Sequence, residues 1–478
     1  MRTHPFIFFI LTLALVPSTS GVSAEASEGP FEPSPFASRI VGVGGSLASE
    51  AVRRHVEFSA SVGFNALWVR SAGAGRWTAV DAPDGPFLEP EFYELARRAV
   101  ELGMRIFLVV EPVSDSGDGF VFSDKEGAQR ISRFLRLARR EAGVHDFVIS
   151  FRGAPLRLTE LSDLLEYGRI AAPAHVELTK RIERKLRSKD RLWLAPAIFS
   201  DRHLDDPLVR YAPALLESLG KLDPRVGIVW SGPQPVSPSI TADNLRAARA
   251  RLGGRHLLLD DRYPANGSGE RIPLSLVLGP LRERVPGIAG EVAGYLSTPM
   301  GELGASRLAL ATVADFLDAP ESYDAEGSWR AAMKRLAGDD REALEALRTQ
   351  AAEWGGWIGT RNYHTARNDN PQTAARDLRD PAVVASWTWT VRTYPERMAA
   401  LEALTDEPFR TDLMLTMARR LAVARCVPIV HELRTESSGD DEKTQALLHA
   451  IREERARVRE RPEVLLALDR FLIHAGLK

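Results

Sequence analysis

Cysteine is almost absent from this chain, and so is any excess of charge of one sign. Cys426 is the single cysteine among 478 residues, so no disulfide can form within the chain. The 62 Lys and Arg residues nearly balance the 64 Asp and Glu residues, which leaves a formal net charge of -2. Such a balance creates no field that would collect nucleic acid or an anionic membrane. We therefore expect neither partner, and we expect stability to come from packing.

Several catalytic sequence patterns are also missing. The 10 histidines form no His-Glu-x-x-His helix and no close cluster with the cysteine, so neither a structural nor a catalytic metal is expected. No Gly-x-Gly-x-x-Gly turn follows the first predicted strand, and no Gly-x-Ser-x-Gly elbow occurs. We therefore expect no cofactor, and a serine hydrolase is disfavoured.

Long apolar runs are missing too, and the longest candidate lies near the amino terminus. Arg2 and His4 precede an apolar run from Phe6 to Val16, and small residues around Ala24 fit a signal-peptidase site. Residues 1–24 are therefore predicted to be a signal peptide, with export to the periplasm or the cell exterior. An uncleaved anchor is the alternative, although the run is short for a bilayer span and no transmembrane segment is expected in the mature chain. Residues 25–38, rich in Pro, Ser and Glu, are predicted to be a flexible lead.

From residue 39 onward, short β-branched runs alternate with amphipathic helices. This pattern predicts an α/β fold with parallel strands and crossover helices. Eight strands suggest a closed (β/α)8 barrel of the TIM type over residues 39–325, and a doubly wound open sheet is the competing architecture. The predicted strands are Ile40–Val43, Ala66–Arg70, Arg105–Glu111, Phe147–Phe151, Leu192–Pro196, Val226–Trp230, His256–Asp260 and Val292–Leu296.

Beyond the barrel the pattern becomes helical only. Residues 326–478 carry apolar residues at three- and four-residue spacing without a convincing strand, which predicts an all-α helical domain. One of its predicted helices, Arg410 to Leu433, contains Pro428, where we expect a break.

Five short motifs follow one another within about a hundred residues of the barrel. In order they are Trp-Ser-Gly-Pro from Trp230, Asp-Asp-Arg-Tyr-Pro-Ala-Asn from Asp260, Leu-Gly-Pro from Leu278, Thr-Pro-Met from Thr298 and Ala-Ser-Arg from Ala305. Their order and spacing resemble those of glycoside hydrolase family 84, the β-N-acetylglucosaminidase and O-GlcNAcase type. The resemblance implies a barrel whose site lies at the carboxyl ends of the strands, and a partner that is a glycan carrying N-acetylglucosamine.

The family's catalytic acids are not retained. The family has two adjacent aspartates at the end of the fourth strand, one orienting the substrate's own acetamido group and the other acting as general acid and base, an exception to the usual two-carboxylate scheme. The corresponding positions here are Arg152 and Gly153. Arginine keeps its proton and glycine has no side chain, so neither can perform these roles. A family lysine falls near Arg70 and a family tyrosine at Phe199, which adds to the evidence for a degenerate or repurposed pocket.

The resemblance leaves three candidate sugar-binding residues. Trp230 matches a family tryptophan whose indole could stack on a pyranose ring. Asp261 and Asn266 match family residues that can hydrogen-bond to sugar hydroxyls. Each also has a structural alternative: a core aromatic for Trp230, a loop cap or arginine partner for Asp261, and a turn residue for Asn266.

Two functions from different classes follow. The first is an exported, catalytically inactive β-N-acetylglucosaminidase-like protein that binds a glycan or acts as a scaffold. The second is an active glycoside hydrolase with relocated carboxylates, for which Glu111 after the third strand and Asp261, next to Asp260, after the seventh are the alternative catalytic residues. Sequence does not give the distance between carboxylates that such a site needs, and Glu111 is alternatively the partner of an arginine such as Arg152.

Overall fold

A closed barrel of parallel strands forms the first half of the described chain. The computed structural model describes residues 36–70, 75–76, 87–113, 120–206, 208–265, 273–354, 371–376, 378, 380–435 and 441–477. The predicted signal peptide and flexible lead therefore lie outside the described residues, apart from the last three residues of the lead. The barrel strands, in their order around the barrel, are β1 (Arg39–Gly42), β2 (Ala66–Arg70), β5 (Arg105–Val110), β6 (Asp146–Ser150), β7 (Arg191–Ala195), β8 (Gly227–Trp230), β9 (Leu257–Pro264) and β10 (Gly294–Thr298), which pairs with β1. The predicted (β/α)8 barrel is confirmed, and the open-sheet alternative is wrong.

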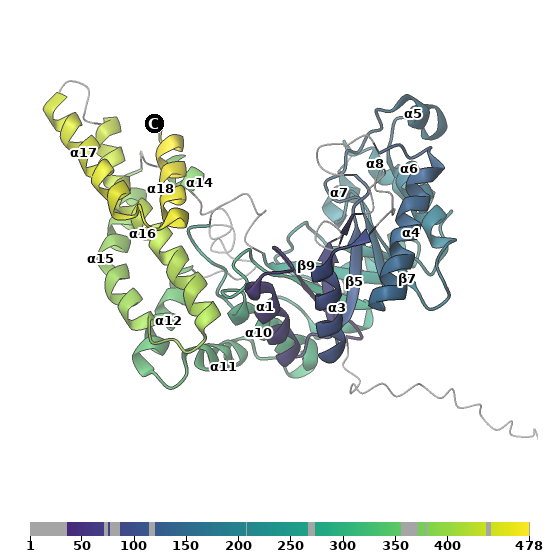
Figure 1. The fold of residues 1–478 in the computed structure, drawn as a ribbon, viewed down its shortest axis with the longest axis horizontal. Helices are drawn as coiled ribbons and strands as arrows, with labels where there is room; N and C mark the ends of the chain where they lie inside the picture. The colour runs from purple at the N-terminus through teal and green to yellow at the C-terminus, as the bar shows by residue number, and fades with distance from the viewer. Residues whose placement is uncertain are drawn as a thin grey trace, which may run out of the picture. The chain divides into compact units, whose positions relative to one another are not determined.

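Helices cover the outside of this barrel (Figure 1). They are α1 (Glu50–Ser61), α3 (Pro90–Glu101), α4 (Lys125–Ala142), α5 (Leu161–Tyr167), α6 (Ala172–Glu183), α7 (Asp201–Asp205), α8 (Tyr211–Leu219), α9 (Ala242–Arg251) and α10 (Arg307–Asp318). The longest, α4, shows why they form: Asp124 caps its first turn, Gly143 ends it with a φ of 66°, and Ile131 and Phe134 on one face are fully buried. A two-stranded antiparallel pair, β3 (Gly75–Arg76) and β4 (Phe87–Leu88), and two 3-10 turns, Pro286–Gly290 and Pro320–Ser322, were not predicted.

The strands divide their side chains between two cores. Alternate residues fill the barrel interior, which contains Ile40, Ala66, Phe107, Val109, Val148, Trp193, Ala195, Val229, Leu258 and Leu296. The residues between them pack outward against the helices. Trp193 is large for this interior, and a Cβ at Gly227 would lie 2.3 Å from its ring, so glycine is required opposite it. The same alternation decides which residues after each strand face the barrel mouth.

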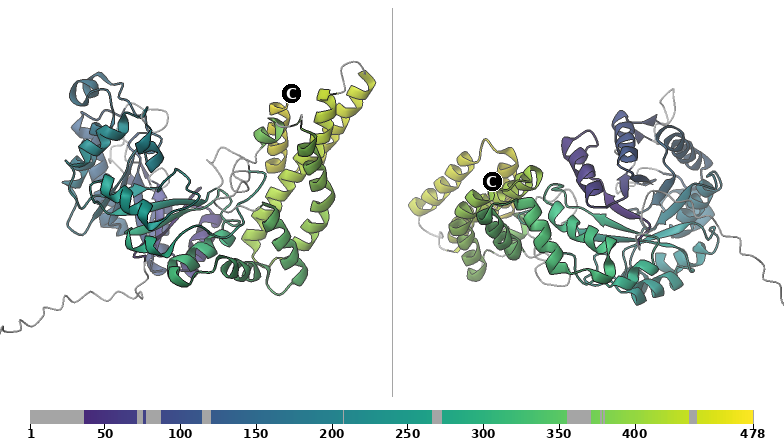
Figure 2. Two further views of the ribbon diagram at one scale, coloured as in Figure 1. Left: turned by 180° about the vertical axis from the view of Figure 1, so that it is seen from behind. Right: turned by 90° about the horizontal axis from the view of Figure 1, so that it is seen from below.

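The second half of the described chain is helical. It contains α11 (Ala325–Ala337), α12 (Arg341–Trp354), α14 (Pro371–Arg376), α15 (Pro381–Leu401), α16 (Glu407–Thr435), α17 (Asp441–Arg457) and α18 (Pro462–His474). Helix α16 packs against α15, α17 and α18. Figure 2 shows these helices, coloured green to yellow, from two further sides. The predicted break at Pro428 is wrong: α16 is continuous, because buried residues on both sides of the proline, Val427 and Val430, hold the helix in a packed core that offsets the lost hydrogen bond.

The barrel and the helices that follow share one hydrophobic core. The outer core of the barrel extends into α11, α12 and the first half of α16, where Phe409, Leu413 and Met417 are fully buried. The second half of α16 belongs to a separate core with α14, α17 and α18. The boundary that we placed between residues 325 and 326 stays a prediction. No helix within the described ranges is long and apolar enough to cross a membrane.

Candidate functional site

The carboxyl ends of the barrel strands bring Arg152 and Asp260 together. Val148 lies inside the barrel, so Ser150 and Arg152 follow it on the inward face of β6. Leu258 likewise lies inside, which turns Asp260 inward on β9. Strands β6 and β9 are separated by β7 and β8. The ion pair between Arg152 Nη1 and Asp260 Oδ2 therefore crosses part of the barrel mouth.

Both members of this pair have further contacts. Asp260 is buried and accepts a second hydrogen bond, from Thr298 Oγ1 at 3.3 Å. The Arg152 side chain is 20% exposed, and its guanidinium carbon lies 4.8 Å from the centre of the Phe199 ring, close enough for a cation–π interaction. The residue that follows, Gly153, has a φ of 82°, which other residues rarely adopt. Neither of the two positions that the resemblance aligns with the family's acids therefore carries a carboxylate.

Glu111 faces the same mouth but is engaged by another arginine. It follows β5 and accepts hydrogen bonds from Arg70 of the neighbouring strand β2, at 2.9 Å from Nε and 2.8 Å from Nη2. Glu111 is thus the partner of an arginine, as the structural alternative proposed, but this arginine is Arg70, whereas Arg152, the example named, pairs with Asp260. The Arg70 side chain is 64% exposed, so this pair is solvated and contributes at most about 1 kcal/mol to stability.

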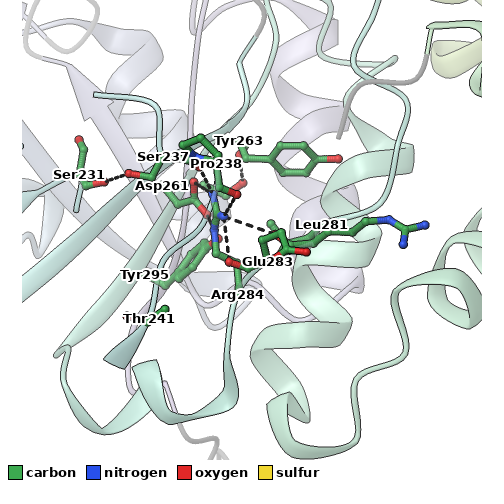
Figure 3. A network of polar contacts seen from close by, with 12 residues as sticks. Ser231, Ser237, Pro238, Thr241, Asp261, Tyr263, Leu281, Glu283, Arg284 and Tyr295 are labelled. Atoms are coloured by element: carbon green, nitrogen blue, oxygen red, sulfur yellow. Dashed lines mark hydrogen bonds and ion pairs between the residues drawn. The ribbon is translucent and has the colours of Figure 1, made fainter. Parts of the chain in front are cut away.

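Asp261 points away from the mouth. Its two carboxylate oxygens accept hydrogen bonds from Arg284, at 2.6 Å from Nε and 2.9 Å from Nη2, and one also accepts the hydroxyl of Tyr295 (Figure 3). Arg284 donates in addition to the backbone oxygens of Ser237 and Pro238. The side chains of Asp261, Arg284 and Tyr295 are all buried. Tyr295 packs against Phe316 of α10, outside the barrel. The structure therefore holds Asp261 in the outer layer, out of reach of a ligand at the mouth.

The electrostatics of this network keep Tyr295 protonated and Arg284 charged. Burial first, and then the charge of Asp261, raise the pKa of the Tyr295 hydroxyl well above its ordinary value, so it remains a donor. Burial alone would lower the pKa of Arg284, but Asp261 more than reverses this effect and raises it. Asp261 and Arg284 thus form a buried ion pair with additional hydrogen bonds, which is the geometry such pairs need to be stable.

Trp230 is also held in the outer layer. Its neighbour Val229 lies inside the barrel, so Trp230 points to the helices; it is fully buried, and its Nε1 donates to Asp201 at 3.1 Å. No sugar ring can stack on it in this arrangement. The third sugar-binding candidate, Asn266, lies outside the described residues. The binding roles of these residues stay predictions, and the positions of Trp230 and Asp261 count against them.

A cleft opens beside the mouth, at the carboxyl ends of β1 and β2. It has a volume of about 580 Å³. The glycine-containing turn from Val43 to Ser46 lines one side, and Arg70, Glu89 and Glu91 line the other. Of these residues the sequence analysis named only Arg70; Glu89 and Glu91 lie at the start of α3, where acidic residues are common for structural reasons alone. Within the described ranges no group of three His, Cys, Asp or Glu side chains is placed to hold a metal ion.

Comparisons with known proteins agree with this architecture. A mutant of the O-GlcNAc hydrolase of Thermobaculum terrenum has a similar solved structure, with 20% sequence identity, a TM-score of 0.62, and 92% of this chain and 94% of that chain covered. The structure of CpGH84B is also similar, at 15% identity and a TM-score of 0.57, covering 92% of this chain and 77% of that one. At these identities the likeness establishes the fold. The family model for beta-N-acetylglucosaminidase matches residues 88–351, more than half of the chain, and the protein therefore belongs to this family, glycoside hydrolase family 84.

Proposed function

We propose that this protein is an exported, catalytically inactive family member that binds a glycan carrying N-acetylglucosamine or acts as a scaffold. The observation that carries the proposal is the ion pair between Arg152 and Asp260. It lies over the barrel mouth, and its guanidinium belongs to the residue that the motif resemblance aligns with the family's first acid.

The chemistry of the mouth supports this proposal. Substrate-assisted cleavage needs one carboxylate to orient the acetamido group and one acid to protonate the leaving oxygen. Arg152 can do neither, and Gly153 has no side chain. A positioned acid or base accelerates such a reaction by about 100- to 10,000-fold, so the loss of both groups predicts hydrolysis too slow to serve a biological role.

The cleft beside the mouth supports a binding function. Its volume of about 580 Å³ is large enough for a small ligand. Arg70, Glu89 and Glu91 offer charged hydrogen-bonding groups, and the turn at Gly44 and Gly45 lets a ligand approach the backbone closely. Sugar hydroxyls are both donors and acceptors, so acidic and basic side chains on one wall suit them.

Hydrolysis of an aryl N-acetyl-β-glucosaminide tests the catalytic part of the proposal. The assay is followed for hours at high protein concentration, with an active family member as positive control. We expect no turnover above the uncatalysed rate. Calorimetric titration with N-acetylglucosamine oligomers tests the binding form; absence of any binding leaves the scaffold form. Sustained turnover would overturn the proposal.

One observation favours the second function, an active hydrolase with relocated acids. Glu111 and Asp260 both face the mouth, from β5 and β9. Each is paired with an arginine, however, so both carboxylates are already engaged by a side chain of the protein. If turnover is found, Glu111→Gln and Asp260→Asn should abolish it. Asp261→Asn is the matched control, since Asp261 points to the opposite face of β9.

The export part of the proposal rests on the sequence of residues 1–24. Expression of the full chain in a bacterial host, followed by cell fractionation and determination of the amino-terminal residue, tests it. We expect a mature chain beginning close to Glu25, outside the cytoplasm. A full-length cytoplasmic product would contradict this part alone.

A further inference from the structure

Trp389 of α15 is the most exposed tryptophan among those that the structure describes. It is 45% exposed, whereas Trp354 and Trp387, in the same helical half of the described chain, are 4% exposed each. Tryptophan is highly buried on average, and the fold buries both of these other indoles. Exposure of one apolar side chain does not by itself make a site, so the argument for a site depends on how the indole is held and on what surrounds it.

The indole of Trp389 is held by an arginine of its own helix. The guanidinium carbon of Arg397 lies 5.4 Å from the centre of the Trp389 ring and 5.4 Å from the centre of the Tyr394 ring. Arg397 is in turn fixed by α12, because its Nη1 donates to Gln350 Oε1 at 2.7 Å and pairs with the carboxylate of Glu353. Its side chain is only 9% exposed. The ring is therefore supported by an immobile group, while much of its surface stays in contact with solvent.

An indole that is both open and held in place is suited to stacking. Because Arg397 already orders the ring, binding costs less side-chain entropy than it would at a freely rotating residue. The face of an indole is electron-rich. A pyranose with equatorial substituents, such as N-acetylglucosamine, presents a flat face of C–H groups that carry a small positive charge. The two surfaces match in shape and in charge without any ionic group on the sugar.

Polar side chains lie one helical turn from the indole on both sides. Ser386 precedes Trp389 by three residues. Arg392 and Thr393 follow it by three and four residues, and these spacings place side chains next to one another on a helix. The Ser386 hydroxyl donates to Val383 O at 2.8 Å, and the Thr393 hydroxyl donates to the backbone oxygen of α15 one turn before it, at 3.1 Å, so both oxygens remain acceptors. The exposed Arg392 is a donor. Sugar hydroxyls can use both kinds of group.

We infer that Trp389 is the centre of a second glycan-binding site, on the helical half of the chain, where a neutral pyranose stacks on the indole. The inference rests on the proposed function for the class of its ligand, a glycan carrying N-acetylglucosamine, but not on the barrel mouth or its cleft. The indole supplies the stacking surface, Arg397 positions it, and the polar groups of the neighbouring turns bond to the sugar hydroxyls. A surface platform of this kind holds one ring of a longer glycan and needs no enclosed cavity.

Fluorine NMR of the full mature chain labelled with 5-fluorotryptophan observes this site directly. The chain has nine tryptophans, and the resonance that disappears in the Trp389→Phe variant belongs to Trp389. The probe is the β-1,4-linked tetramer of N-acetylglucosamine. We expect the Trp389 resonance to shift in a saturable manner as the tetramer is added. The resonance of the buried Trp387, assigned in the same way, is the internal control and should not move.

Titration calorimetry with the same tetramer gives the affinity. The wild type should show a binding component that is weakened by about 10-fold or more in Trp389→Ala, the size expected for the loss of one aromatic stacking contact. Trp389→Phe keeps a smaller ring and should retain part of this component. Leu466→Ala is the matched control, because Leu466 is another exposed apolar residue of the helical half, at 48%, and this variant should bind as the wild type does. Because Trp389 is exposed, the melting temperatures should stay close to that of the wild type.

The outcomes separate this inference from the function on which it rests. If calorimetry detects binding but the Trp389 resonance does not move, the inference is overturned and glycan binding elsewhere stands. A resonance that shifts with protein concentration and not with sugar would also overturn it, because a second copy of the chain would then cover the indole. If neither method detects binding, the inference and the glycan-binding form of the proposed function both fail. A saturable shift together with weaker binding of Trp389→Ala supports the inference, and if no binding at all remains in that variant, only binding at the barrel fails.

Discussion

Replacement of Arg284 by methionine should strongly destabilise the barrel. Methionine fills most of the volume of the side chain but removes the charge and all of its donors. Among the described residues, Asp261 then remains buried with only the Tyr295 hydroxyl as a side-chain donor. The backbone oxygens of Ser237 and Pro238 lose their partner in the same change.

The structure gives the magnitude. Removal of one partner from a buried ion pair costs about 3–5 kcal/mol, because the remaining charge is left without compensation. For a compact unit spanning residues 35–478, an unfolding entropy of about 2.1 cal/mol/K per residue converts this loss into a fall of about 3–5 °C in the melting temperature. Replacing both partners, Arg284→Met with Asp261→Leu, should cost less than either single change, because no charge is then left buried alone.

Thermal unfolding followed by circular dichroism at neutral pH measures these shifts. The position of Asp261 makes the test informative, because it was also a sugar-binding candidate. The assignment of Asp261 to the outer layer is refuted if Asp261→Asn lowers sugar affinity but leaves the melting temperature unchanged. It is also refuted if the Arg284→Met variant has the same melting temperature as the wild type. Loss of stability with unchanged sugar affinity supports it.

Two further perturbations test the packing of the barrel. Gly227→Ala places a Cβ 2.3 Å from the Trp193 ring, so it should lower the free energy of unfolding by about 1–3 kcal/mol in a denaturant titration. Gly290→Ala is the control, because a Cβ there meets nothing within 4 Å and should change the free energy of unfolding by less than about 0.5 kcal/mol. Equal effects of the two substitutions would contradict the tight fit at Gly227. Burial lowers the pKa of His175 to about 3, below its unfolded value of about 6.5. Its contribution to stability is therefore complete above pH 6.5 and is lost, by up to about 1.4 kcal/mol per pH unit, as pH falls toward 3. His175→Gln, which can keep the hydrogen bond to Tyr211, should flatten this part of the stability curve, and an unchanged curve would show that His175 takes up no proton on unfolding.

The barrel could be predicted because its signal is local and repeated. Most strands are short apolar runs followed by a helix, and all eight predicted strands overlap the observed ones. The errors have local causes as well. Pro428 was expected to end a helix, but tertiary packing outweighs the proline. Within the segment predicted to be helical, no separate helix was assigned to the residues of α18, although Pro462 at its start is a typical first-turn residue.

The site was harder to predict because it depends on which way side chains face. Trp230 and Asp261 were chosen from motifs, whereas the residues that reach the mouth are their neighbours in the chain, Ser231 and Asp260. The alternation of a strand places adjacent residues on opposite faces, so Asp260 and Asp261 could not both face the mouth. Which of them does so depends on the register around the closed barrel. Arg284, which lies 23 residues beyond Asp261, has no sequence signal that would pair it with that carboxylate.

The shared core has a practical consequence for dividing the chain. A fragment ended at residue 325 would leave the outer layer of the barrel without Phe409, Leu413 and Met417 of α16. It would also remove the Asp412 carboxylate that accepts the N–H of Ala305, just before α10. Such a fragment would expose a hydrophobic surface and aggregate. A fragment that is meant to fold independently as the barrel therefore has to include the first half of α16.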